Sequence, residues 1–194
     1  MRKNVHALIT SSVLVTLVLS TTSQAASIEE IKKRAAEINE FKALVNDADP
    51  ALRLAAIDSM QNSSDLAAKE MAFSAGFNAA DESVVALTIR NRFSEIDNFV
   101  VKLTAPEGEG KPQEVFAWAG GQVMFNILSY DKDKGTFSNR THLANSKNQS
   151  TISGLNLHLA SNYCQGSFRL ADDLVYRGNM TCDKAQFPAE IQLF

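Results

Sequence analysis

The chain has 194 residues, of which 45% are hydrophobic and 21% are charged, and its formal net charge is −3 at pH 7. This length is enough for one substantial domain, or for two small domains that each bury a core. A net acidic chain without a basic stripe is poorly suited to a phosphate backbone, so composition excludes nucleic-acid binding.

The first 25 residues have the pattern of a secretory signal peptide. Arg2 and Lys3 supply positive charge, the apolar stretch is densest over 13–19, and small residues end at Ala25. Hydroxyl-bearing residues dilute this stretch below the roughly 20 predominantly apolar residues that a spanning helix needs. We therefore expect cleavage before Ala26, a mature chain without a transmembrane segment, and a periplasmic or secreted location.

Residues 27–45 predict an amphipathic helix. Ser27 and Glu30 have the spacing of a capping box, in which each side chain bonds the backbone amide of the other residue. Apolar side chains then recur every three or four residues as far as Val45, which gives the helix one apolar face.

Residues 49–93 contain a regular repeat. Asp49, Asp65 and Asp81 are sixteen residues apart, and each stands directly before a helical apolar pattern. An aspartate in that position accepts amide hydrogens that the first turn of a helix cannot bond internally. We expect three short helices that pack on one another, on the first helix or on the segment that follows.

Residues 49–57, with the sequence DPALRLAAI, are similar to the Asp-Pro-x-x-Arg-x-x-Ala helix of HEAT and armadillo-type repeats. The step from Asp49 to Asp81 matches a pair of helices in a short HEAT-like unit. The resemblance covers roughly residues 45–93 and fails in the third segment, where Val85 stands in place of the arginine. It implies a protein-binding scaffold and no catalytic residues.

Residues 95–194 alternate between apolar and polar side chains, which predicts a β domain. Seven strand patterns lie at 99–104, 114–119, 122–129, 155–159, 164–170, 176–182 and 188–193, and the polar segment 129–150 is expected to be a loop. Gly120 and Gly121 have the form of a two-residue hairpin turn. That hairpin sets Phe116 and Trp118 in the core, an interpretation that we favour over an aromatic platform for sugars.

The predicted fold is therefore α+β, with a signal peptide at 1–25, a HEAT-like helical region at 26–94 and an antiparallel β-sandwich or small open barrel at 95–194. Cys164 and Cys182 both lie in the exported part, and an even number of cysteines favours a disulfide in an oxidising compartment. A hairpin that turns near residues 172–173 would bring the two cysteines opposite each other on one face.

Candidate binding residues lie in the polar segment, where a recognition loop could form. They are Asn139, Arg140 and His142. No nucleophile motif, zinc motif or phosphate-binding glycine loop is present, so we predict no catalytic residue, metal or cofactor.

The sequence favours an exported binding or interaction protein, such as an adaptor or inhibitor that acts on a protein of the cell envelope. A glycan is the other candidate ligand. The alternative function is hydrolysis of envelope glycans or peptides, which needs two positioned carboxylates or a nucleophile–base pair. Neither has a recognisable spacing in the sequence.

Overall fold

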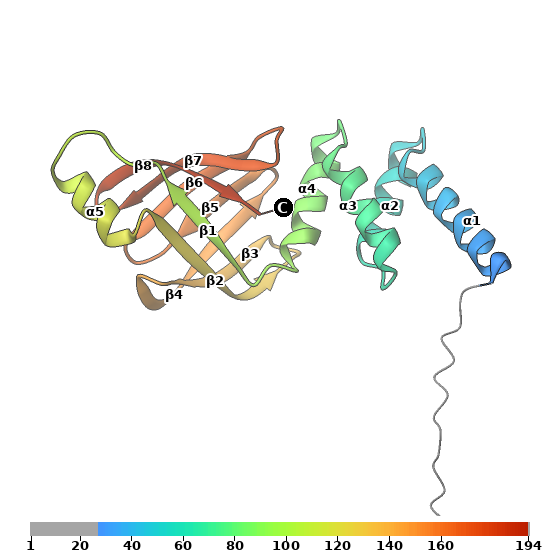
Figure 1. The fold of residues 1–194 in the computed structure, drawn as a ribbon, viewed down its shortest axis with the longest axis horizontal. Helices are drawn as coiled ribbons and strands as arrows, with labels where there is room; N and C mark the ends of the chain where they lie inside the picture. Colours follow the sequence, from blue (N-terminus) through green and yellow to red (C-terminus); the bar gives the residue numbers. More distant parts are fainter. Residues whose placement is uncertain (1–26, 194) are drawn as a thin grey trace, which may run out of the picture.

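The computed structural model describes residues 27–193, so the predicted signal peptide lies outside the described residues. The molecule is elongated, with a stack of helices at one end and a β-barrel at the other (Figure 1). The helices before the barrel are α1 (Ile28–Val45), α2 (Pro50–Gln61), α3 (Leu66–Phe77) and α4 (Glu82–Phe93). The mixed α+β class that the sequence predicts is confirmed.

Side-chain caps begin these helices where the sequence predicts them. Ser27 Oγ accepts a hydrogen bond from Glu30 N, and the Glu30 carboxylate accepts one from Ser27 N at 2.7 Å, which completes the capping box. Asp49, Asp65 and Asp81 each accept a hydrogen bond from the amide two residues later. The sixteen-residue spacing therefore corresponds to a twelve-residue helix followed by a four-residue connection.

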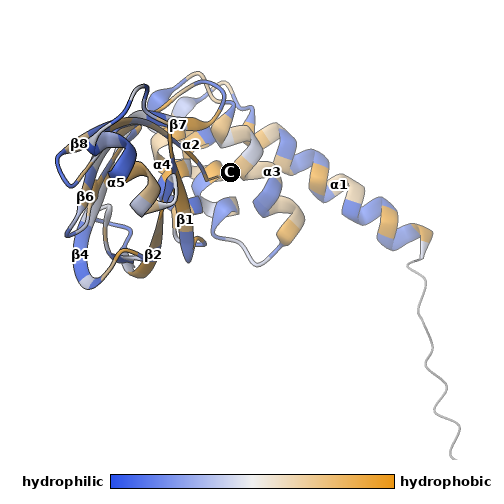
Figure 2. Ribbon diagram, turned by 60° about the vertical axis from the view of Figure 1, so that its left-hand side comes forward, coloured by the Kyte–Doolittle hydropathy of each residue, from blue (hydrophilic) through white to orange (hydrophobic). Residues whose placement is uncertain are grey.

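The longest of these helices, α1, is amphipathic, and hydrophilic and hydrophobic segments alternate along it in Figure 2. Its C-terminal end packs on the stack, where Val45 is buried. Its N-terminal end extends beyond the stack, so Ile28 and Ile31 are 72% and 58% exposed. Within residues 27–193, no helix combines the length and the apolar character needed to cross a membrane.

A small core holds the helical stack together, and its buried polar side chains bond one another. Gln61 Nε2 donates to Ala72 O at 3.1 Å and to Thr88 Oγ1 at 3.0 Å, and Gln61 Oε1 accepts from Asn91 Nδ2 at 2.7 Å. A Cβ atom at Gly76 would overlap the Thr88 hydroxyl, so the glycine permits the close approach of α3 and α4. The apolar part of this core consists of Val45, Ile57, Met60, Ala68, Ala72 and Val84.

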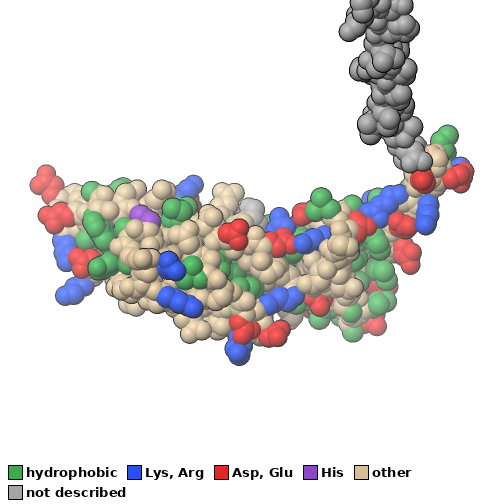
Figure 3. Space-filling model, turned by 90° about the horizontal axis from the view of Figure 1, so that it is seen from below, with side chains coloured by type: hydrophobic (Ala, Val, Ile, Leu, Met, Phe, Trp, Pro, Cys, Tyr) green, Lys and Arg blue, Asp and Glu red, His purple; other side chains and the backbone are tan. Residues whose placement is uncertain are grey.

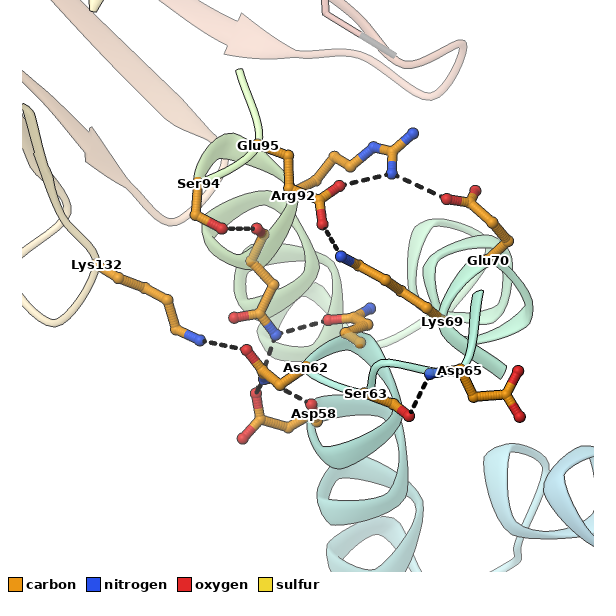
Figure 4. Close-up of polar contacts among 12 residues, drawn as sticks. Asp58, Asn62, Ser63, Asp65, Lys69, Glu70, Arg92, Ser94, Glu95 and Lys132 are labelled. Atoms are coloured by element: carbon orange, nitrogen blue, oxygen red, sulfur yellow. Dashed lines mark hydrogen bonds and ion pairs between the residues drawn. The ribbon is translucent and has the colours of Figure 1, made fainter. Parts of the chain in front are cut away.

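Charged and amide side chains join the helices to each other and to the barrel (Figure 4). Arg92 lies 2.9 Å from the Glu95 carboxylate, with which Lys69 of α3 also pairs. Lys132, in the turn after the second barrel strand, donates to Asn62 Oδ1 at 3.1 Å. Half-buried and exposed pairs of this kind contribute modestly to stability.

The last helix of the stack also closes one end of the barrel. Ile89 and Phe93 are fully buried and belong to the core of the barrel. The Phe93 ring lies 4.8 Å from that of Phe137 and 5.2 Å from that of Tyr130, measured between ring centroids. The stack and the barrel therefore share a core through α4.

The barrel is a closed antiparallel meander in which every strand pairs with its neighbour in the chain. Closure is made where Lys102 pairs with Glu190 and Leu103 with Ala189. The predicted sandwich or open barrel is thus corrected to a closed barrel. Its strands in the described range are β1 (Asn98–Leu103), β2 (Gln122–Asp131), β3 (Thr136–Thr141), β4 (Ala144–Ser153), β5 (Asn156–Ala160), β6 (Cys164–Leu170), β7 (Val175–Cys182) and β8 (Ala185–Gln192).

Side chains fill the interior of this barrel. Alternate residues of β8 are buried, and the residues between them are exposed, as the pleat of a strand requires. Tyr176 is fully buried, and burial raises the pKa of its hydroxyl. Other large side chains that point inward are Val101, Phe125, Phe137, Ile152, Leu157, Met180, Phe187 and Ile191.

Two sequence-based predictions in the β domain are wrong. The segment expected as a strand at 114–119 belongs to helix α5 (Lys111–Ala119), and Gly120 ends that helix in the left-handed conformation instead of forming a hairpin turn. This helix covers the end of the barrel opposite α4 (Figure 1). The polar segment expected as a loop contains β3 and most of β4. Its inward polar groups bond one another, as when Ser150 Oγ donates to Asn139 Oδ1 at 2.8 Å.

The predicted disulfide is confirmed. Cys164 of β6 is bonded to Cys182 of β7, and the two residues are direct partners in the antiparallel register. Both cysteines are buried in the core of the barrel.

Candidate functional site

A surface groove with a volume of about 520 Å³ lies at the α5 end of the barrel, and we refer to it as the aromatic groove. One wall is a single face of α5, because its four lining positions on that helix follow a three- and four-residue spacing. The other wall is formed by the β5–β6 and β7–β8 turns. The lining residues are Lys111, Glu114, Val115, Trp118, Tyr163 and Asp183.

Two exposed aromatic side chains face each other in this groove. Trp118 is 48% exposed and Tyr163 is 50% exposed, and their ring planes meet edge to face with centroids 5.6 Å apart. Large aromatic side chains are usually buried, and those left exposed are enriched at sites that bind partners. Next to the rings, Lys111 Nζ lies 3.0 Å from an Asp183 carboxylate oxygen. The groove therefore offers apolar area beside a positive and a negative group.

The disulfide holds one wall of the groove in place. Tyr163 precedes Cys164, Asp183 follows Cys182, and Asp183 N donates to Tyr163 O at 2.9 Å. Asp183 and Lys184 form the β7–β8 turn with φ angles of 42° and 71°, a conformation that favours glycine. Side chains kept in such a strained turn are often found at functional sites.

The structure separates Asn139 from the other two predicted binding residues, Arg140 and His142. Asn139 is fully buried, and its amide donates to Ala160 O and accepts from Ser150, so it is a structural element of the barrel. Arg140 is exposed and donates to Asn145 Oδ1. His142 is also exposed, and its Nδ1 accepts a hydrogen bond from Met124 N at 3.2 Å. A binding role for Arg140 and His142 stays a prediction.

Sequence reasoning assigned Trp118 to the core, and that interpretation is wrong. Its side chain is on the exposed face of α5, whereas Val115 and Ala119 carry the packing against the barrel. The available signal was Pro112 in the first turn together with Gly120 after the last turn, a pattern typical of a helix.

One further polar pair lies on the outer wall of the barrel. His158 Nδ1 and Ser167 Oγ are 3.0 Å apart, on neighbouring strands where the two residues are register partners. Within the described part of the chain, no group of three or more His, Cys, Asp or Glu side chains is arranged to hold a metal ion.

Apolar side chains are also exposed on the helical stack, and Figure 3 shows them gathered along this region. Besides the two isoleucines of α1, Leu66 is 70% exposed and Leu52 is 45% exposed. Leu66 follows Asp65, which pairs with Arg34 of α1 at 2.6 Å. Exposed apolar side chains thus lie on each of α1, α2 and α3.

No family model, curated protein or solved structure matches this chain in the comparisons with known proteins. The resemblance to HEAT-type repeats accordingly stays a prediction.

Proposed function

We propose that this is an exported binding protein, periplasmic or secreted, that captures a component of the cell envelope in the aromatic groove. The observation that carries this proposal is the exposed Trp118–Tyr163 pair in a concave site. Rigid aromatic rings supply large contact area at low cost in conformational entropy, which is why they dominate binding energy at many interfaces.

Export is supported by the disulfide that forms one wall of the groove. Disulfides persist in oxidising compartments and are rare in the cytosol. The secretory pattern of residues 1–25 supports the same location. In this proposal the oxidising compartment and the binding site are connected, because the bond fixes the two turns that carry Tyr163 and Asp183.

The helical stack is a second surface of the same binding protein. If its resemblance to HEAT-type repeats reflects a shared use, it is a scaffold for a protein partner, and the molecule is an adaptor or inhibitor. Exposed Ile28, Ile31 and Leu66 supply the apolar area that such a contact needs.

Hydrolysis is the second candidate function, and the His158–Ser167 pair is the observation that favours it. A histidine can activate a serine by accepting its proton, but acyl transfer also needs donors for the oxyanion that develops. Ser167 lies in the middle of β6, which is paired with strands on both sides. Its neighbouring amides are committed to the sheet, so we favour binding over catalysis.

The test compares retention of an envelope fraction on immobilised wild-type protein and on the variant Trp118→Ala. We expect the wild type to retain material that the variant loses, because the ring forms one side of the groove. Trp118 is the only tryptophan in the chain, so its fluorescence reports on occupancy once the emission of the fraction alone is subtracted. The emission of the wild type should shift when the fraction is added.

Leu128→Ala is the matched control. Leu128 is 41% exposed on β2 and does not line the aromatic groove, so its removal deletes similar exposed apolar area elsewhere. Both variants should have wild-type circular dichroism spectra. Equal retention by Trp118→Ala and by the wild type would contradict the proposed function.

A further inference from the structure

Two more grooves continue from the aromatic groove across the outer wall of the barrel. A groove of about 340 Å³ shares Tyr163 and Asp183 with the aromatic groove. It in turn shares Gln165 and Thr181 with a third groove of about 410 Å³. The three grooves therefore adjoin one another, and we refer to them together as the channel, which begins at Trp118 and extends over strands β5 to β8.

Uncharged hydrogen-bonding side chains line the far part of this channel. Gln165, Thr181 and Gln186 are successive register partners on β6, β7 and β8, and they form one row across the sheet. Ser167 and Asn179 form a second row beside the first. Apart from His158, the lining residues of the third groove have no ionisable side chain, although 21% of the chain is charged.

Four of these side chains have unused hydrogen-bonding capacity. Within residues 27–193, the side chains of Gln165, Asn179, Thr181 and Gln186 form no hydrogen bond to the protein. Each amide can donate two hydrogen bonds and accept others, and the threonine hydroxyl can do both. Adjacent strands are about 4.8 Å apart, so neighbouring side chains within a row are spaced at nearly the length of one sugar unit in a linear glycan.

Resting on the proposed function, we infer that the ligand is a linear, uncharged glycan. In this arrangement the apolar face of one sugar ring stacks in the aromatic groove, where Trp118 and Tyr163 lie. The following sugars extend over β5 to β8, and their hydroxyl groups bond the amide and hydroxyl rows. An extended peptide has no equivalent place, because the closed barrel leaves no free sheet edge between β5 and β8 for strand addition.

The probes are two preparations of the envelope fraction, one digested exhaustively with proteinase and one oxidised with periodate, which cleaves sugar rings. We expect the wild type to bind the proteinase-treated fraction, with a shift in Trp118 fluorescence, and to lose binding to the periodate-treated one. The glycan inference would be overturned if the wild type no longer bound the proteinase-treated fraction but still bound the periodate-treated one. In that case the proposed function would still hold, with a protein as the partner. The function itself is contradicted only if Trp118→Ala retains as much of the envelope fraction as the wild type does.

Gln186→Leu tests the polar rows, and Gln192→Leu is its control. Both glutamines are exposed on the same side of β8, but only Gln186 lines the channel. Loss of two hydrogen bonds should raise the half-saturating concentration of the proteinase-treated fraction about tenfold for Gln186→Leu. Gln192→Leu should bind like the wild type. Equal binding by both variants would exclude the polar rows from the site and overturn the assignment of a linear glycan.

Discussion

Asp65 has two roles, of which the sequence predicts one and only the structure shows the other. It caps α3 by accepting from the amides of Ala67 and Ala68, and it pairs with Arg34 of α1 at 2.6 Å. The hydrogen bond from Arg34, followed by the one from Ala68 N, holds the pKa of the Asp65 carboxyl below its usual value of 3.8. The cap follows from adjacent residues, whereas the ion pair depends on how two helices pack.

This lowered pKa makes the docking of α1 dependent on pH. A carboxyl group whose pKa is lower in the folded state stabilises the fold above its unfolded pKa, and that contribution is lost as pH falls through the folded pKa. Asp65→Asn keeps a good capping residue but removes the charge. We expect the melting temperature of Asp65→Asn to be below that of the wild type at pH 7. This difference should shrink as pH falls below 3.8 towards the lowered pKa.

Asp81→Asn is the control, because Asp81 caps α4 in the same way and forms no ion pair within the described residues. It should change the melting temperature at pH 7 less than Asp65→Asn does. If the melting temperatures of Asp65→Asn and the wild type differ by the same amount at pH 7 and at pH 3, the Arg34 pair does not stabilise the fold.

Single residues also explain which parts of the site the sequence could predict. Asp49, Asp65 and Asp81 were predictable as caps because a cap depends on the two or three residues after it. Asn139 was not predictable as a buried residue, because its partners Ser150 and Ala160 come from other strands. Polar residues that hydrogen-bond one another inside a barrel have the same sequence pattern as a loop when only one segment is considered.

At the level of elements, the aromatic groove is built by α5 and by the two turns that flank the hairpin of β6 and β7. Of these elements only the hairpin was predicted. Cys164 and Cys182 indicated the pairing of the strands, and the register matches it. The segment 114–119 alternates closely enough to suit a strand, but Pro112 and Gly120 set the ends of a helix. Because α5 was misassigned, the exposed face that carries Trp118 could not be recognised.

The disulfide should contribute both stability and binding. Its cysteines are 18 residues apart, and a loop of this length restricts the unfolded chain by about 3 kcal/mol. The double variant Cys164→Ala and Cys182→Ala should therefore have a free energy of unfolding lower by about 3 kcal/mol, measured by urea denaturation. It should also bind the envelope fraction more weakly at a temperature where it is still folded, since the bond fixes Tyr163 and Asp183. Wild-type binding by the folded variant would show that the groove does not need the bond.

At the scale of the whole molecule, sequence patterns could not predict that the barrel closes. Alternation shows that a strand has a buried face, but a sandwich and a barrel have the same alternation. What distinguishes them here is the pairing of β1 with β8, which joins residues more than eighty positions apart. The position of α4 is equally non-local, because its helical pattern does not reveal that Phe93 enters the barrel.

The shared position of α4 predicts that the helical stack and the barrel unfold together. Phe73 is 3% exposed and lies in α3, within the stack. Trp118 lies on α5, which covers the far end of the barrel (Figure 1), so its fluorescence reports on barrel unfolding. Phe73→Ala should cost roughly 3–5 kcal/mol by leaving a cavity. We expect the helical circular dichroism signal and the Trp118 fluorescence to shift to lower urea concentration by the same amount. A shift in the helical signal alone would show that the stack unfolds independently, and that Ile89 and Phe93 do not couple it to the barrel.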